Sequence, residues 1–352
     1  MKKYLFTCLF LLGMLVAGAQ SKVQTDSIAE DMLLFQRTTG GWPKHIPFRG
    51  KKEIKVNYRR LNLTDQEREI LRADSNRMDA TYDNYATFKE ITYLVKAFQH
   101  TQNPAYLKAA EKGIVYILAG QYQDTGGWPQ FYPLRGGYPD HITYNDNAMI
   151  NNLIILQQVV DGSNGFNVVN QDFVEPAKKA VRKGIECILK TQVVVEGKLT
   201  VWCAQHDEKT LLPAKARAYE LESLSGQESV GVIQFLMSIK NPSDSVVRAI
   251  QGAMKWIDDN KIEGYTTKFI KVEGRSRDYD RIFVAEAGAV TWARFYDLET
   301  GKPFFCGRDG IKKSAMNEIE YERRAGYGWY GEWPKNLLEK EYPAWKERMG
   351  MK

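Results

Sequence analysis

The sequence predicts a mainly helical fold of the α/α toroid type, an incomplete ring of helical hairpins with a minor β-hairpin element. Two observations lead to this expectation. Apolar residues recur at helical spacing along most of the chain, and one loop motif occurs twice, each time before a similar helix. Stacked helical hairpins bury a shared core and present their connecting loops on one rim, so we expect functional residues in those loops.

The N-terminus has the pattern of an export signal. Lys2 and Lys3 precede an apolar run over 4–16, and Ala17-Gly18-Ala19 comes next as a small-residue cleavage site. The run is too short to span a bilayer. We therefore expect residues 1–19 to be a signal peptide and residues 20–352 to form a single secreted or periplasmic domain, without membrane insertion after cleavage.

Amphipathic spacing places the helices. Apolar residues recur at 107, 110, 114 and 117, at 149, 153, 156 and 160, and at 247, 250, 254 and 257. Further helices are expected at about 84–99, 174–191, 226–238 and 283–296. Few segments favour strands: 193–195 and 199–202 flank Glu196-Gly197-Lys198 as a hairpin would, and 265–272 is a candidate small strand.

The repeated loop motif is Thr-Gly-Gly-Trp-Pro, at 39–43 and again at 125–129. Each copy precedes a tyrosine-rich stretch and then an Asp-Asn pair that opens an apolar helix, Asp83-Asn84 and Asp146-Asn147. Residues 329–334 form a looser third copy. Trp42 and Trp128 have two readings: they anchor tight turns, or they stack on sugar rings.

The two aspartates also have more than one reading. Asp is a preferred N-cap residue, so each carboxylate alone is explained by helix capping. Two equivalent carboxylates on one rim, however, would meet in a shared cleft. Such hard oxygen ligands suit calcium, and the same pair would also suit the acid and base of a glycosidase.

Composition excludes some classes of protein. The formal net charge is +6, and it falls to +4, from 47 basic and 43 acidic residues, without Lys2 and Lys3. This mild, dispersed charge does not indicate nucleic-acid binding, and it is compatible with an acidic polymer. Three cysteines remain beyond the signal segment, widely spaced and odd in number, which is neither a disulfide framework nor a zinc pattern.

An ordered series of motifs resembles polysaccharide lyase family 10, the pectate lyases. Besides the two Gly-Gly-Trp-Pro loops, the series comprises residues 82–87, 145–147, 202–207, 217–226, 292–296 and 305–310. The resemblance implies an α/α toroid catalytic core and a carbon-oxygen lyase. It further implies that the enzyme cleaves α-1,4-linked polygalacturonate by β-elimination, with Ca²⁺ as cofactor and a pectin oligosaccharide as partner. We expect a monomer.

The resemblance also implies roles for particular residues. Asp83 and Asp146 match the aspartates of the calcium cleft, and Arg217 matches the arginine proposed as Brønsted base. Arg308 matches the arginine that grips a substrate carboxylate, a role that Arg294 is also placed to take. The further cleft residues that we expect to bind substrate are Asn84, Asn147 and Lys215.

The β-elimination of a uronate requires positively charged groups near the substrate carboxylate. Removing the C5 proton of a uronate creates negative charge next to a carboxylate, so cations at that carboxylate would stabilise the transition state. A guanidinium is a poor base at its ordinary pKa, so Arg217 needs nearby cations such as Lys215. Two alternatives stay open: a metal-independent glycoside hydrolase that uses Asp83 and Asp146 as acid and base, and a non-catalytic uronate-binding protein.

Overall fold

The structure is a computed structural model that describes residues 24–46, 54–274 and 277–351, so the expected signal peptide lies outside the described residues. Its α-helices are α1 (Ser27–Phe35), α2 (Asp65–Ala73), α3 (Phe88–Thr101), α4 (Pro104–Ala119), α5 (Ala148–Asp161), α6 (Val174–Thr191), α7 (Glu228–Ser238), α8 (Asp244–Asp259), α9 (Tyr321–Gly326) and α10 (Tyr342–Arg348). Its strands are β1 (His45–Ile46), β2 (Ile54–Lys55), β3 (Ile142–Thr143), β4 (Val194–Val195), β5 (Lys198–Leu199), β6 (Gln205–His206), β7 (Leu224–Ser225), β8 (Ile262–Lys271), β9 (Tyr279–Ala293), β10 (Phe295–Tyr296), β11 (Phe305–Cys306), β12 (Lys312–Lys313) and β13 (Tyr330–Gly331).

Three helical hairpins form the body of the molecule. Helix α3 packs on α4, α5 on α6, and α7 on α8, and α5 contacts both α3 and α7. Their apolar faces meet in one large buried cluster that extends from α1 to α10. The amphipathic spacing therefore predicted these helices correctly, with α6 covering the expected 174–191.

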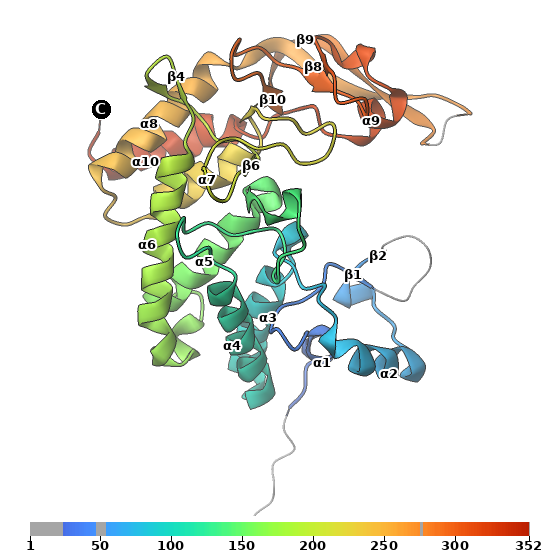
Figure 1. The fold of residues 1–352 in the computed structure, drawn as a ribbon, viewed down its shortest axis with the longest axis vertical. Coiled ribbons are helices and arrows are strands. Elements are labelled where there is room, and N and C mark those ends of the chain that lie inside the picture. Colours follow the sequence, from blue (N-terminus) through green and yellow to red (C-terminus); the bar gives the residue numbers. More distant parts are fainter. Residues whose placement is uncertain (1–23, 47–53, 275–276, 352) are drawn as a thin grey trace, which may run out of the picture.

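The expectation of a mainly helical toroid was wrong. The described residues form several sheets, and a three-stranded sheet of order β13-β9-β8 contributes much of the C-terminal part. Figure 1 shows β8 and β9 together at the top of the view, far from α1 and α3. The helices thus share the fold with β-structure, and a closed or partial α/α ring is not what these elements make.

The main error concerns residues 283–296, which were expected to be a helix. Residues 283–293 belong to β9 and residues 295–296 to β10, and β9 pairs with β8 from Tyr279 opposite Lys271 to Thr291 opposite Ile262. The pairing shifts register near Gly264 and Gly288, whose φ angles are 78° and 79°. Glycine at positive φ marks a β-bulge here, and it would be unfavourable in a helix.

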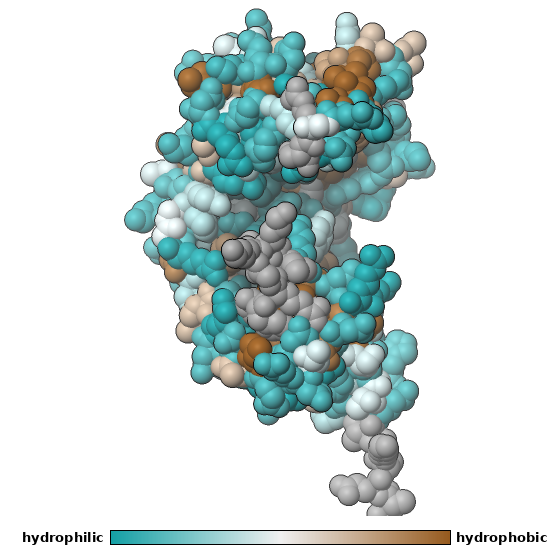
Figure 2. All heavy atoms as spheres, turned by 90° about the vertical axis from the view of Figure 1, so that its right-hand side faces the viewer, coloured by the Kyte–Doolittle hydropathy of each residue, from teal (hydrophilic) through white to brown (hydrophobic). Residues whose placement is uncertain are grey.

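The surface near β8 and β9 carries exposed apolar side chains. Tyr265, Phe269 and Ile270 of β8 are exposed. Figure 2 shows a mostly hydrophilic face, with apolar atoms gathered near the top, where Figure 1 places this hairpin.

Among the described residues, no helix is long and apolar enough to cross a membrane.

Four tryptophans, three in loops and one near the end of β9, are fastened to helices in the same way. The indole Nε1 of Trp42 donates to the carbonyl of Met32, Trp128 to Ile117, Trp202 to Ile188, and Trp292 to Ile257, each over 2.7 to 2.8 Å. All four side chains are completely buried. The reading of Trp42 and Trp128 as packed anchors is therefore confirmed, and neither is available to stack on a sugar.

The paired glycines of the motif allow close packing. Gly40 and Gly126 have φ angles of 99° and 82°, and a Cβ on either would collide with the carbonyl of Lys112 or Lys183. Each loop therefore lies directly on a helix of the hairpins, α4 for the first copy and α6 for the second. Only glycine permits both this backbone conformation and this approach.

Candidate active site

The predicted carboxylates lie on two adjacent turns. Asp83 begins a single 3-10 turn (Asp83–Tyr85), and Asp146 is the middle residue of another (Asn145–Asn147), and the two turns pack together. The backbone of both is unusual, since φ is positive at Asn84, Tyr85, Thr87, Asp146 and Asn147. Non-glycine residues seldom adopt positive φ, and clusters of such strain are typical of functional sites.

Neither aspartate caps a helix. The N-cap residue of α3 is Thr87 and that of α5 is Asn147, and no side chain makes a capping hydrogen bond at either. The same holds at the starts of the two 3-10 turns. Capping therefore does not explain why a carboxylate occupies these positions.

The two carboxylates face each other, and their ionisation differs. Burial, together with the charge of Asp83 and then that of Glu228, raises the pKa of Asp146 to about 6. Burial has the same tendency at Asp83, but an ion pair with Lys44 outweighs it and lowers the pKa of Asp83 below its ordinary value. Although buried, Asp83 Oδ1 has no hydrogen-bond donor among the described residues.

A third acidic residue, Glu228, was missed by the sequence reasoning. It lies at the start of α7, accepts hydrogen bonds from the Ser225 hydroxyl and from Arg294, and is 3% exposed. Its local signal is Ser225-x-x-Glu228, the spacing of a helix-capping pair. Arg294 also donates to Asn145 Oδ1 over 3.0 Å, so this arginine ties Glu228 to the turn that carries Asp146.

A pocket of about 270 Å³ opens beside Asp146. Asn147 and Glu228 line it, together with Tyr85, Gly231 and Trp333. A Cβ at position 231 would collide with the amide of Asn147, so Gly231 makes room for that side chain. Asn84 lies on the neighbouring turn, where its Oδ1 accepts a hydrogen bond from Lys55. The structure thus places Asp83, Asp146, Asn84, Asn147 and Arg294 near one another.

Arg217 does not line this pocket, and a series of side-chain contacts connects the two. Its guanidinium makes a two-point ion pair with Glu220, with Nε donating over 2.6 Å. Burial tends to lower the pKa of Arg217, but the bonds and charge of Glu220 prevail and raise it well above its ordinary value. Arg217 is therefore held protonated, and Lys215 alone does not make it a base.

The remaining predicted residues are more exposed. Arg308 Nε and Nη2 donate to the Glu322 carboxylate over 3.1 and 3.3 Å. Burial raises the pKa of Tyr219, and the positive charge of Arg308 partly opposes this rise. Arg217 also lies over the Tyr219 ring, with its guanidinium carbon 5.1 Å from the ring centre. Lys215 is exposed, and in the described parts of the chain its side chain makes no hydrogen bond or ion pair with the other site residues.

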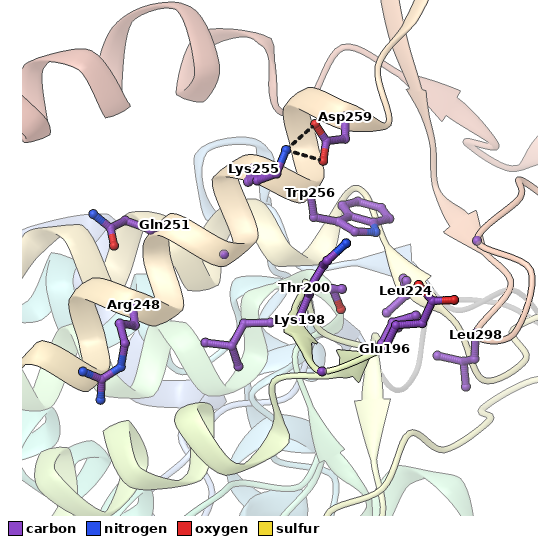
Figure 3. A pocket seen from close by; sticks show the side chains of 15 residues that line it. Glu196, Lys198, Thr200, Leu224, Arg248, Gln251, Lys255, Trp256, Asp259 and Leu298 are labelled. Carbon is purple, nitrogen blue, oxygen red and sulfur yellow. Dashed lines mark hydrogen bonds and ion pairs between the residues drawn. The ribbon is translucent and has the colours of Figure 1, made fainter. Parts of the chain in front are cut away.

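Two further features lie away from the predicted residues. His141, Asp207 and Glu208 have potential metal-ligand atoms within 4.8 Å of one another where β3 and β6 meet. A larger hollow of about 570 Å³ lies between α8, the β4–β5 hairpin and Leu298. Figure 3 shows Lys198, Arg248 and Lys255 around it, with Lys255 paired to Asp259. None of the residues predicted for the site lines this hollow.

Similar solved structures define the class of protein. A family 10 polysaccharide lyase from Cellvibrio cellulosa is 34% identical, with a TM-score of 0.78, over 92% of both chains. A mutant of such a lyase from the same organism, in complex with trigalacturonic acid, shows the same identity and TM-score over 90% of this chain and 92% of that one. The fold is thus that of a polysaccharide lyase, which is an enzyme.

The family is established by the sequence match. A family model described as pectic acid lyase matches residues 36–338, and the chain belongs to the pectic acid lyase family. The resemblance to pectate lyases that the motifs indicated is confirmed, as is the lyase activity inferred from it. A search of curated proteins gives no significant match.

Proposed function

We propose that this pectate lyase cleaves α-1,4-linked polygalacturonate by calcium-assisted β-elimination at the Asp83–Asp146 site. The observation that carries the proposal is the pair of facing carboxylates, neither of which caps a helix. The trigalacturonic acid bound to the similar Cellvibrio mutant supports an oligogalacturonate as substrate.

The donor set suits a calcium ion. Asp83 Oδ1 is buried without a donor among the described residues, and the Asp146 carboxylate is held close to it despite mutual repulsion. Calcium prefers carboxylate and amide oxygens, which Asp83, Asp146, Asn84 and Asn147 supply. A cation between the carboxylates would remove the repulsion and satisfy the buried oxygen. We therefore assign Asp83 and Asp146 as metal ligands.

Bound calcium would neutralise the uronate carboxylate and thereby acidify the C5 proton. Arg217 is the proposed group that receives this proton, and it does so as the neutral guanidine, after the guanidinium has given up its own proton to solvent at alkaline pH. Arg308, Arg294 and Lys215 supply positive charge for substrate carboxylates. The C4–O bond then breaks, the oxygen leaves with the cleaved part of the chain and takes up a proton, and a 4,5-unsaturated product remains without addition of water.

A glycoside hydrolase at the same site is the weaker candidate. The raised pKa of Asp146 and the lowered pKa of Asp83 resemble an acid and base pair. However, the carboxyl groups of glycosidases stand roughly 5 to 9.5 Å apart on either side of the bond that they cleave. Asp83 and Asp146 lie instead on two turns that pack together, and each influences the ionisation of the other.

The test detects the product of elimination. Purified protein is mixed with polygalacturonate at alkaline pH, with calcium or with excess chelator, and the ultraviolet absorbance of the 4,5-unsaturated uronate is recorded. We expect an increase that chelation abolishes. New reducing ends without that absorbance would refute elimination and support the hydrolase, while substrate binding without either signal would support a binding protein. We also propose that the protein is a secreted or periplasmic monomer. Cell fractionation tests its location, and light scattering tests its oligomeric state.

A further inference from the structure

We propose that Glu220 is a positioning residue that orients Arg217 and leaves one amino group of its guanidinium free for substrate. This inference rests on the proposed function, because it takes Arg217 as the group that acts on the uronate. Glu220 itself is 4% exposed, so it is not placed to bind the polymer.

The geometry fixes the plane of the guanidinium. Arg217 Nε donates to Glu220 Oε2 over 2.6 Å, and Nη2 donates to Oε1. A two-point ion pair of this kind restrains rotation as well as distance. Nη1 makes no hydrogen bond within the described part of the chain, so it is the nitrogen left to face a ligand. A tight turn supports the pair, since the Glu220 amide donates to the Arg217 carbonyl over 2.8 Å.

Glu220 is held in turn by residues near the carboxylate site. The Tyr327 hydroxyl donates to Glu220 Oε1 over 2.6 Å, and the Arg294 guanidinium lies 4.5 Å from the centre of the Tyr327 ring. Burial tends to raise the pKa of Glu220, but the bonds and charge of Arg217, with help from Tyr327 and Arg294, lower it. Glu220 therefore remains ionised, and it keeps its hold on Arg217.

The same contacts connect Arg217 to the proposed metal ligands. Arg294 bonds to Glu228 and to Asn145, the residue before Asp146. A continuous series of side chains thus runs from the carboxylate pair to Arg217. Because each member is buried or bonded at two points, the series sets where the arginine stands relative to the ion-binding oxygens.

Glu220 also controls the ionisation of Arg217. The titratable groups that face Arg217 are Glu220 and the phenols of Tyr219 and Tyr327, while Arg323 and Arg308 stand near the Tyr219 ring. Of these, Glu220 raises the pKa of Arg217 most. Without its charge, burial and the neighbouring arginines would favour the neutral guanidine, so proton acceptance would begin at lower pH.

The experiment measures kcat and KM against pH for Glu220→Gln and Glu220→Asp. For Glu220→Gln we expect kcat to fall about tenfold or more, with a smaller change in KM, because the arginine loses its orientation. We also expect the rising limb of the pH profile to move to lower pH by about one unit or more. Glu220→Asp keeps the charge, so its limb should stay near that of the wild type while part of kcat is recovered.

Asp280→Asn is the matched control. Asp280 and Arg324 form a similar two-point ion pair, in which Arg324 Nε donates to Asp280 Oδ1 over 2.9 Å. Asp280 is also buried. Arg324 bonds elsewhere to the Ile319 carbonyl, away from the proposed site residues. We expect this variant to lose stability without moving the pH profile. Thermal melting of each variant shows whether it is folded at the assay temperature.

The outcomes separate the two proposals. If Arg217→Ala abolishes elimination but Glu220→Gln leaves both kcat and the pH profile unchanged, Glu220 does not position the arginine, and this inference alone fails. A lower kcat with an unmoved limb, matched by Asp280→Asn, indicates a purely structural role and also overturns it. If Arg217→Ala retains full turnover, the assignment of Arg217 itself fails, and the inference fails with it.

Discussion

Replacing Asp146 by Asn should stabilise the calcium-free protein. The Asp146 carboxylate is partly buried and faces Asp83 and Glu228, so its charge is unfavourable in the folded state. An amide has nearly the same shape but carries no charge. Asp146→Asn therefore removes the repulsion and keeps the packing of the turn, and the same change removes a proposed calcium ligand.

The pKa of Asp146 gives the expected magnitude. A pKa of about 6 in place of 3.8 means that the native protein binds the Asp146 proton more tightly than the unfolded chain does. Stability is therefore lost as pH rises from about 4 to about 6. Each pKa unit corresponds to about 1.4 kcal/mol, so the full loss is about 3 kcal/mol. Because solvent reaches part of Asp146, we expect a gain of about 1 to 3 kcal/mol for Asp146→Asn above pH 6.

Urea unfolding in excess chelator measures this difference at about pH 8 and at about pH 4. The variant should be more stable than the wild type at the higher pH and nearly equal at the lower pH, where Asp146 is protonated. Added calcium should stabilise the wild type, by about 2.7 kcal/mol at a hundredfold excess over Kd, and should not stabilise the variant. A variant that is less stable in chelator at the higher pH would refute the reasoning, because the carboxylate would then be a structural group.

Three other substitutions test neighbouring features. Gly231→Ala should displace the Asn147 amide and weaken calcium binding, measured by calorimetry, more than it changes the melting temperature. Trp128→Phe removes a buried indole bond and part of the packing, so urea unfolding should show a loss of about 1 to 3 kcal/mol while kcat at low temperature is retained. Arg308→Ala should raise KM for polygalacturonate with little change in kcat, and a lower kcat at unchanged KM would contradict its role in binding.

The helices were predictable because each hides one apolar stripe, a property that appears directly in the spacing of the residues. The strand β9 was not, because its hydrogen bonds are made to β8, and its middle part around Glu286 is exposed and has no clear alternation. Pairing across a hairpin is a tertiary property. The glycines at 264 and 288 were the available local sign that a helix does not fit there.

The site was predictable where it repeats. Asp83 and Asp146 come after the same loop motif, and that recurrence indicated a shared cleft. Glu220 and Glu228 belong to no repeated motif. Their segments come near Arg294 and Asp146 only in the folded protein. Trp202 and Trp292 continue the anchoring pattern but lack the flanking Gly-Gly and Pro, so the repeated loop motif does not reveal that they share this role.

The four tryptophan anchors attach other parts of the chain to the helical body. Each indole bond holds its tryptophan, and so the start of the segment that follows, against a helix of the body. The anchor at Trp202 thus fixes the start of the segment that carries Arg217 and Glu220 to α6, so the position of the proposed catalytic arginine depends on the packing of the helical body.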